Sequence, residues 1–186
     1  MKSRTLHITL LLLFAFCVTA YPACWESPVK QAGIISPTPA SGFGRILFKF
    51  DLPSQLQGVI IDFADLTFFA TPDTGSSYIC LMGAFPVTRS WEPASLSWSN
   101  GWTNAGGDHA DSIFSTSVIR TSSERPSRVD ITDIVQMWVD GTLANYGLMV
   151  MPLGDSNRFL KLHANPAFEP DVKAKVRIFY TLMSGD

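Results

Sequence analysis

The feature that most constrains this fold is a series of short segments in which apolar and polar side chains alternate. In residues 45–52 (RILFKFDL), every second side chain from Ile46 onward is apolar, and residues 64–70 and 174–182 repeat the pattern. A repeat of two residues is typical of a β-strand that buries one face. The side chains expected to face inward are Ile46, Phe48, Phe50, Leu52, Ala64, Leu66, Phe68, Ala70, Val176, Ile178, Tyr180 and Leu182.

Other segments are apolar almost throughout, and turn-forming residues separate them. Residues 78–87 and 146–153 are typical of central strands, which are covered on both faces. Clusters of Gly, Pro, Asn, Asp and Ser between the segments indicate turns. The sequence therefore predicts an all-β fold, an antiparallel β-sandwich of about eight to ten strands.

One short helix is expected to interrupt the strands, in residues 129–142 (VDITDIVQMWVDGT). Its apolar side chains recur at helical spacing, and Asp130 or Thr132 can cap the first turn. Gly141 can end the helix in the left-handed conformation. We expect the helix to be stabilised by packing, as a lid on one open end or face of the sandwich. The apolar stripe consists of Ile131, Ile134, Val135 and Trp138.

The first twenty residues have the pattern of an export signal. Lys2 and Arg4 precede an apolar run, residues 8–18, that is too short to cross the ~30 Å of hydrocarbon in a bilayer. Small residues at positions 18 and 20 predict cleavage after Ala20. No later apolar stretch has spanning length. We therefore expect a secreted, extracellular protein without a membrane span.

Charge argues against a nucleic-acid partner. Lys2 and Arg4 belong to the leader, so the mature chain keeps 12 of the 14 basic residues against 16 acidic ones, a net charge of about −4. The basic residues are scattered rather than clustered, and nucleic-acid binding depends on a basic patch.

Two cysteines, Cys24 and Cys80, remain after cleavage. In an oxidising compartment, a disulfide that ties the N-terminal arm to a strand is the simplest state. The alternatives are acylation of Cys24 as a lipid anchor, with Cys80 unpaired, or two unpaired thiols.

The segment 90–102 (SWEPASLSWSNGW) raises the question of whether its indoles bind sugar or fill the core. Trp91 and Trp98 lie next to strand-like apolar positions, and we expect them and Trp138 to be buried. Trp102 lies in a loop rich in Gly and Asn and is the best candidate among the aromatic residues for a ligand-facing ring. The alternative is that it is a plug packed on the sandwich. Trp25 and Tyr146 are weaker candidates for ligand contacts.

Exposed cations are a second set of candidate ligand-binding residues. Arg158 and Lys161 lie near one loop and can meet an acidic glycan of the uronate type; the competing interpretation is salt bridging on a solvated sheet face. Other cations of this kind are Arg45, Lys49 and Arg89.

Acidic residues in the glycine-rich loop are weak metal candidates. Asp108 and Asp111 flank His109, and calcium suits their hard oxygen ligands, although loop acids of this spacing are usually only solvated. No other cofactor is indicated. The sequence contains no Ser-His-Asp order, zinc spacing or phosphate loop, so we expect a protein that is not an enzyme.

The order of these motifs resembles a known family. The W-E-x-x-x-L-x-W segment starting at Trp91 and the D-I-T…V-x-x-W…G…N-Y-G segment starting at Asp130 resemble the DNRLRE domain, also called carbohydrate-binding module family 96. The resemblance covers residues 44–180. It implies a jelly-roll-like sandwich, secretion or cell-surface placement, and polysaccharide binding.

The domain organisation follows from these features. We expect a signal peptide in residues 1–20, an N-terminal arm with the first edge strand in residues 21–43, and the DNRLRE-like sandwich in residues 44–182. The favoured function is non-catalytic polysaccharide binding, with an acidic glycan of the uronate type as one ligand class. The alternative is an extracellular structural or adhesion module that binds no glycan.

Overall fold

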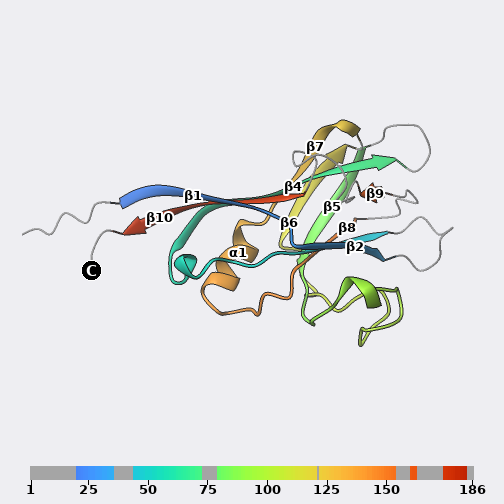
Figure 1. The fold of residues 1–186 in the computed structure, drawn as a ribbon. Helices are drawn as coiled ribbons and strands as arrows, with labels where there is room; N and C mark the ends of the chain where they lie inside the picture. Colours follow the sequence, from blue (N-terminus) through green and yellow to red (C-terminus); the bar gives the residue numbers. More distant parts are fainter. Residues whose placement is uncertain are drawn as a thin grey trace, which may run out of the picture.

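Two antiparallel sheets packed face to face, with one α-helix at their edge, form the fold (Figure 1). The computed structural model describes residues 20–35, 44–72, 79–120, 122–153, 160–162 and 174–183. This architecture confirms the predicted all-β sandwich with one short helix. The predicted leader, residues 1–20, lies outside the described residues except for Ala20.

The first sheet has the strand order β1-β10-β4-β7, and β9 also pairs with β4. The second sheet has the order β2-β3-β8-β5-β6. The strands of the first sheet are β1 (Ala20–Pro28), β4 (Ile60–Pro72), β7 (Ser122–Asp130), β9 (Leu160–Leu162) and β10 (Lys175–Met183). Those of the second are β2 (Gln31–Ile35), β3 (Arg45–Lys49), β5 (Ile79–Pro86), β6 (Ser115–Arg120) and β8 (Leu148–Pro152). The helical elements are α1 (Thr132–Val139) and the 3₁₀ turns η1 (Ser54–Leu56) and η2 (Pro93–Ser95).

The N-terminal arm belongs to both sheets. β1 pairs with β10 along its whole length, and β2 pairs with β3. Residues 20–35 therefore contribute an edge strand to each sheet.

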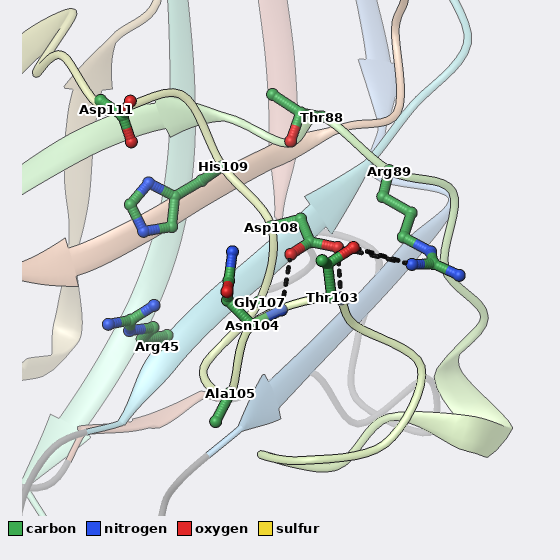
Figure 2. A pocket seen from close by; sticks show the side chains of 10 residues that line it. All are labelled: Arg45, Thr88, Arg89, Thr103, Asn104, Ala105, Gly107, Asp108, His109 and Asp111. Atoms are coloured by element: carbon green, nitrogen blue, oxygen red, sulfur yellow. Dashed lines mark hydrogen bonds and ion pairs between the residues drawn. The ribbon is translucent and has the colours of Figure 1, made fainter.

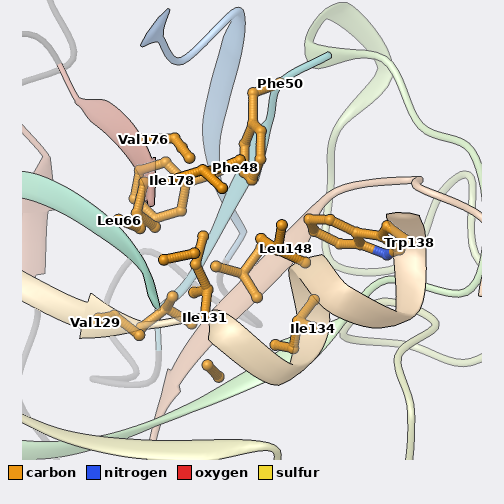
Figure 3. Packing of buried hydrophobic residues seen from close by; sticks show 14 of the residues in the cluster. Phe48, Phe50, Leu66, Val129, Ile131, Ile134, Trp138, Leu148, Val176 and Ile178 are labelled. Carbon is orange, nitrogen blue, oxygen red and sulfur yellow. The ribbon is translucent and has the colours of Figure 1, made fainter. Parts of the chain in front are cut away.

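The main core lies between the sheets, and most of the predicted inward positions fill it (Figure 3). The rings of Phe48 and Phe68, from opposite sheets, have their centroids 5.1 Å apart. Leu182 is the exception, because its side chain is 42% exposed. At that end of the sandwich β1 and β10 extend past the second sheet (Figure 1). Inward positions that are buried are Ile46, Phe48, Phe50, Ala64, Leu66, Phe68, Val176, Ile178 and Tyr180.

Helix α1 covers the edge of β4 in the part of that strand with which β7 does not pair. The amide of Ala64 donates to Thr132 Oγ1 (3.0 Å), and the amide of Ile61 donates to Gln136 Oε1 (2.7 Å). These side chains supply the acceptors that a neighbouring strand would otherwise provide. Asp130 Oδ1 accepts from the amide of Thr132 (2.9 Å), and Gly141 follows the helix at φ +71°, as predicted for the two ends.

A second apolar cluster lies on the outer side of the second sheet. Residues 88–110 fold over this face, and Trp91 and Trp102 pack there with Leu47, Phe85 and Met149. β3 is therefore buried on both faces. The expectation that its second face would be polar is wrong at Leu47, because the alternation within the strand contains no information on the distant loop that covers it.

The predicted disulfide between Cys24 and Cys80 is absent, and both residues are thiols. Cys24 is exposed on β1, whereas Cys80 is buried on β5 of the other sheet. The Cys80 thiol lies 3.3 Å from Met82 Sδ. The two sulfurs are therefore in different layers, and a disulfide between them would require the sheets to rearrange.

Candidate functional site

The candidate site is a cavity of about 490 Å³ on the loop side of the second sheet (Figure 2). We call it the Arg45 cavity. The start of β3 supplies Arg45, and the loop that covers the sheet supplies most other side chains. The polar side chains that line it include Arg45, Arg89, Asn104, Asp108, His109 and Asp111.

Asp108 holds the loop in shape. Its carboxylate accepts from the amides of Thr103 (2.7 Å) and Asn104 (3.0 Å), and Arg89 Nη1 lies 3.9 Å away. Burial alone would raise the pKa of Asp108, but the hydrogen bonds from Thr103 and Asn104 and the charge of Arg89 together lower it below the usual 3.8. Asp108 is therefore ionised at neutral pH and fixes the turn that carries Asn104.

Arg45 is a half-buried cation for which the described part of the chain supplies no acidic partner. Its guanidinium lies over the Trp98 ring, 4.9 Å from the centroid, and Nη1 donates to the carbonyl of Gly106 (2.6 Å). Burial lowers the pKa of Arg45, but a guanidinium remains charged at any physiological pH. Within the described ranges, no carboxylate lies within ion-pair distance of Arg45.

The approach of Arg45 to the loop requires a glycine at position 106. Gly106 has φ +94°, a conformation that other residues adopt only with strain. A Cβ on Gly106 would also lie 2.8 Å from Arg45 Nη1. The loop backbone is thus shaped around the guanidinium.

His109 and Asp111 complete the polar wall. His109 Nδ1 lies 2.8 Å from the carbonyl of Ala110, which only accepts, so Nδ1 carries the proton and Nε2 of the neutral ring is an acceptor. The ring packs edge-on against Phe85, with centroids 5.1 Å apart. Figure 2 shows His109 between Arg45 and the exposed Asp111. Among the described residues, the cavity combines a cation that has no acidic partner with several acceptors, which suits a ligand that carries both a carboxylate and hydroxyl groups.

The structure agrees with the alternative interpretation of Trp102, a plug packed on the sandwich. The ring is 9% exposed, and Nε1 donates to the carbonyl of Ser97 (3.0 Å). It packs as a plug on the outer face of the second sheet, in contact with the apolar cluster there. Trp91 is buried as predicted, and its Nε1 donates to the carbonyl of Tyr146 (2.8 Å). Trp98 is half-buried beneath Arg45.

Trp25 and Tyr146, two of the other predicted contact residues, do not line the Arg45 cavity. Trp25 is half-buried on β1 and packs on the main core, and Tyr146 is half-buried beside the outer cluster. Arg158 lies outside the described residues. Lys161 lies in β9, where its backbone pairs with Thr71, and its side chain is outside the described part.

The structure brings together some candidates that are far apart in the sequence. Arg45 and Arg89 now share one cavity with Asp108 and Asp111. For the metal hypothesis, no group of three or more His, Cys, Asp or Glu side chains in the described residues is arranged to hold a metal ion. Both oxygens of Asp108 already accept hydrogen bonds from the loop. The sequence analysis did not identify Asn104 as a candidate binding residue. Its position in the glycine-rich loop was the only feature of the sequence that pointed to it.

Over the described ranges, no helix has the length and apolar character needed to cross a membrane. In comparisons with known proteins, neither a protein-family model nor a curated protein matches this chain. The resemblance to the DNRLRE domain therefore stays a prediction.

Proposed function

We propose that this chain is a secreted, non-catalytic polysaccharide-binding protein, similar to the DNRLRE domain, that holds an acidic glycan of the uronate type in the Arg45 cavity. The observation that carries the proposal is the half-buried guanidinium of Arg45, which has no carboxylate partner among the residues that the structure describes. A partly desolvated charge costs free energy until an opposite charge pairs with it. A uronate carboxylate supplies that charge with a geometry that matches the guanidinium fork.

The neighbouring groups suit the rest of a sugar ring. His109 Nε2 and the Asp111 carboxylate accept hydrogen bonds, and the Asn104 amide both donates and accepts. Hydroxyl groups can satisfy all three. Trp98 supports the guanidinium from below and restricts its movement, which favours a preorganised site.

The lowered pKa of Asp108 supports a non-catalytic role for this cavity. Hydrolysis of a glycosidic bond requires a carboxylic acid that is protonated at working pH, and its pKa is normally raised. Asp108 has the opposite shift and is held by loop amides. We infer that it maintains the binding loop rather than transferring protons.

The export signal supports secretion, with the mature chain starting at Tyr21. Intact mass of the protein recovered from an export-competent host measures this directly. A chain starting at Tyr21 with no added mass agrees with the proposal, whereas a lipid mass on Cys24 shows the anchored alternative.

The second candidate is a structural or adhesion module without glycan binding. It is favoured by the burial of Trp91 and Trp102, whose indole N–H groups are bonded to the main chain. Rings held in this way stabilise the loop, and they leave little of their surface exposed for stacking on a sugar.

Affinity electrophoresis separates the two candidates. Gels containing alginate or pectin should retard the wild-type protein, and gels containing xylan or chitin serve as comparison. Arg45→Gln should weaken binding about ten- to a hundredfold, the equivalent of about 1.5–3 kcal/mol for a hydrogen bond to a charged group. Lys30→Gln is the matched control, because it removes the same charge from an exposed pair with Asp51 away from the cavity. No retardation on either acidic polymer would favour the structural module. Equal retardation of the wild type and Arg45→Gln would show that the glycan binds outside the Arg45 cavity.

A further inference from the structure

We propose that the Arg45 cavity accepts one free carboxylate at a time, so that its preferred ligand is a glycan in which an isolated uronate lies between neutral sugar units. The inference rests on the function proposed above and narrows its ligand class from acidic glycans in general to sparsely charged ones. Heteropolymers of uronate and neutral sugars belong to this class, and so do polyuronates in which the neighbouring carboxylates are methyl-esterified.

The two cations that line the cavity are not equally available to a ligand. Arg89 Nη1 donates to Thr103 Oγ1 (3.0 Å) and lies 3.9 Å from the Asp108 carboxylate, so its charge already has a counterion. Arg45 contacts a carbonyl and an indole ring, but no carboxylate of the described residues lies at ion-pair distance from it. The guanidinium of Arg45 is therefore the one that can pair with a ligand carboxylate. A second carboxylate in the cavity finds no further unpaired cation among the described lining residues.

The two anions of the cavity differ in the same way. Asp108 is balanced by Arg89 and accepts from two amides of the loop. Asp111 is exposed, and no Lys or Arg side chain in the described part of the chain lies within ion-pair distance of it. Its charge therefore remains unbalanced in the wall, and His109 lies between it and Arg45 (Figure 2).

This distribution of charge distinguishes a ligand with one carboxylate from a ligand with several. With a uronate paired to Arg45, a neighbouring neutral unit can donate hydroxyl hydrogen bonds to His109 Nε2 and to the Asp111 carboxylate. A neighbouring uronate instead brings a second negative charge toward Asp111. Two like charges about 7 Å apart in partly solvated surroundings repel each other enough to weaken binding about three- to tenfold. The cavity therefore favours neutral neighbours on both sides of the uronate.

Uronate trimers that differ only in their free carboxylates test this proposal. Trigalacturonate and trimannuronate are each prepared fully methyl-esterified, with a free acid on the middle unit only, and with three free acids. Calorimetric titration of the mature protein at low ionic strength, where repulsion is least screened, measures the dissociation constants. In at least one of the two sugars, we expect both acid forms to bind, and the fully esterified form to bind at least about tenfold more weakly than the single acid.

The decisive variant is Asp111→Asn, which removes the unbalanced charge but keeps a hydrogen-bond acceptor. It should tighten binding of the triacid about three- to tenfold and leave binding of the single acid within about twofold. Asp133→Asn is the matched control, because it changes the net charge equally at an exposed position that does not line the cavity. It should leave the binding of both acid forms within about twofold.

The outcomes separate this inference from the proposed function. If no acid trimer binds, or if Arg45→Gln binds the trimers as tightly as the wild type, the function proposed for the Arg45 cavity is wrong. If the acid trimers bind through Arg45 but Asp111→Asn affects the triacid no more than Asp133→Asn does, the proposed function stands. In that case the preference for a single carboxylate is wrong.

Discussion

The Arg45 cavity depends on contacts made by single residues of the loop 88–110. Arg45 contacts Trp98 and Gly106, which lie more than fifty positions away in the sequence. Asp108 holds the amides of Thr103 and Asn104. These contacts could not be predicted from the sequence, because the spacing of Arg45 in its strand is typical of any exposed cation on a sheet.

Asp108→Asn should lower the free energy of unfolding by about 1–3 kcal/mol at neutral pH, because an amide cannot accept both loop N–H groups as the carboxylate does. Urea denaturation measures this. The matched control is Asp111→Asn at an exposed position, which should change stability by less than about 0.5 kcal/mol. Equal effects of the two substitutions would contradict the role given to Asp108.

The stability difference between the wild type and Asp108→Asn should also depend on pH. Since the pKa of Asp108 is lowered in the folded state, its stabilising contribution is present above the usual value of 3.8 and is lost as the pH falls through the lowered pKa. The difference in stability between the wild type and Asp108→Asn should therefore shrink below about pH 4. A constant difference across the acidic range would show that Asp108 does not titrate with a lowered pKa.

At the scale of elements, side chains of α1 replace backbone pairing at the edge of β4. Thr132 and Gln136 accept from strand amides that would otherwise be unpaired. The helix itself was predictable from its apolar spacing and from Asp130 and Gly141. The packing of this helix against β4 could not be predicted, because a Gln side chain in a helix is usually exposed to solvent.

Thr132→Val should destabilise the fold by about 1–3 kcal/mol, because it leaves the Ala64 amide without its acceptor. Hydrogen exchange of that amide should accelerate together with the loss measured by denaturation. Thr142→Val, at an exposed position just after α1, makes the same chemical change and should have little effect. Unchanged exchange at Ala64 would rule out this docking contact.

At the scale of the whole molecule, the two outer faces of the sandwich differ. Residues 88–110 cover much of the second sheet, whereas Phe63 and Phe179 on the first sheet are 40% and 37% exposed. The alternation of residues such as Ile46 and Phe48 predicted the layer between the sheets. It could not predict the outer cluster, because which face a long loop covers depends on contacts between distant segments.

The two sheets are held by packing and not by a bond between Cys24 and Cys80. Cys24→Ser should therefore change the free energy of unfolding by less than about 0.5 kcal/mol, as expected for an exposed side chain. Loss of a native disulfide typically costs about 2–5 kcal/mol. If Cys24→Ser lowers the free energy of unfolding of the oxidised protein by that amount, measured by denaturation, the disulfide between Cys24 and Cys80 does form.

The most direct measurement for the central claim is a crystal structure of the protein with a short oligouronate. The account predicts a uronate carboxylate within hydrogen-bond distance of the Arg45 guanidinium, with sugar hydroxyls on Asn104 or His109. An oligouronate bound on another face, with the Arg45 cavity empty of sugar, would contradict it.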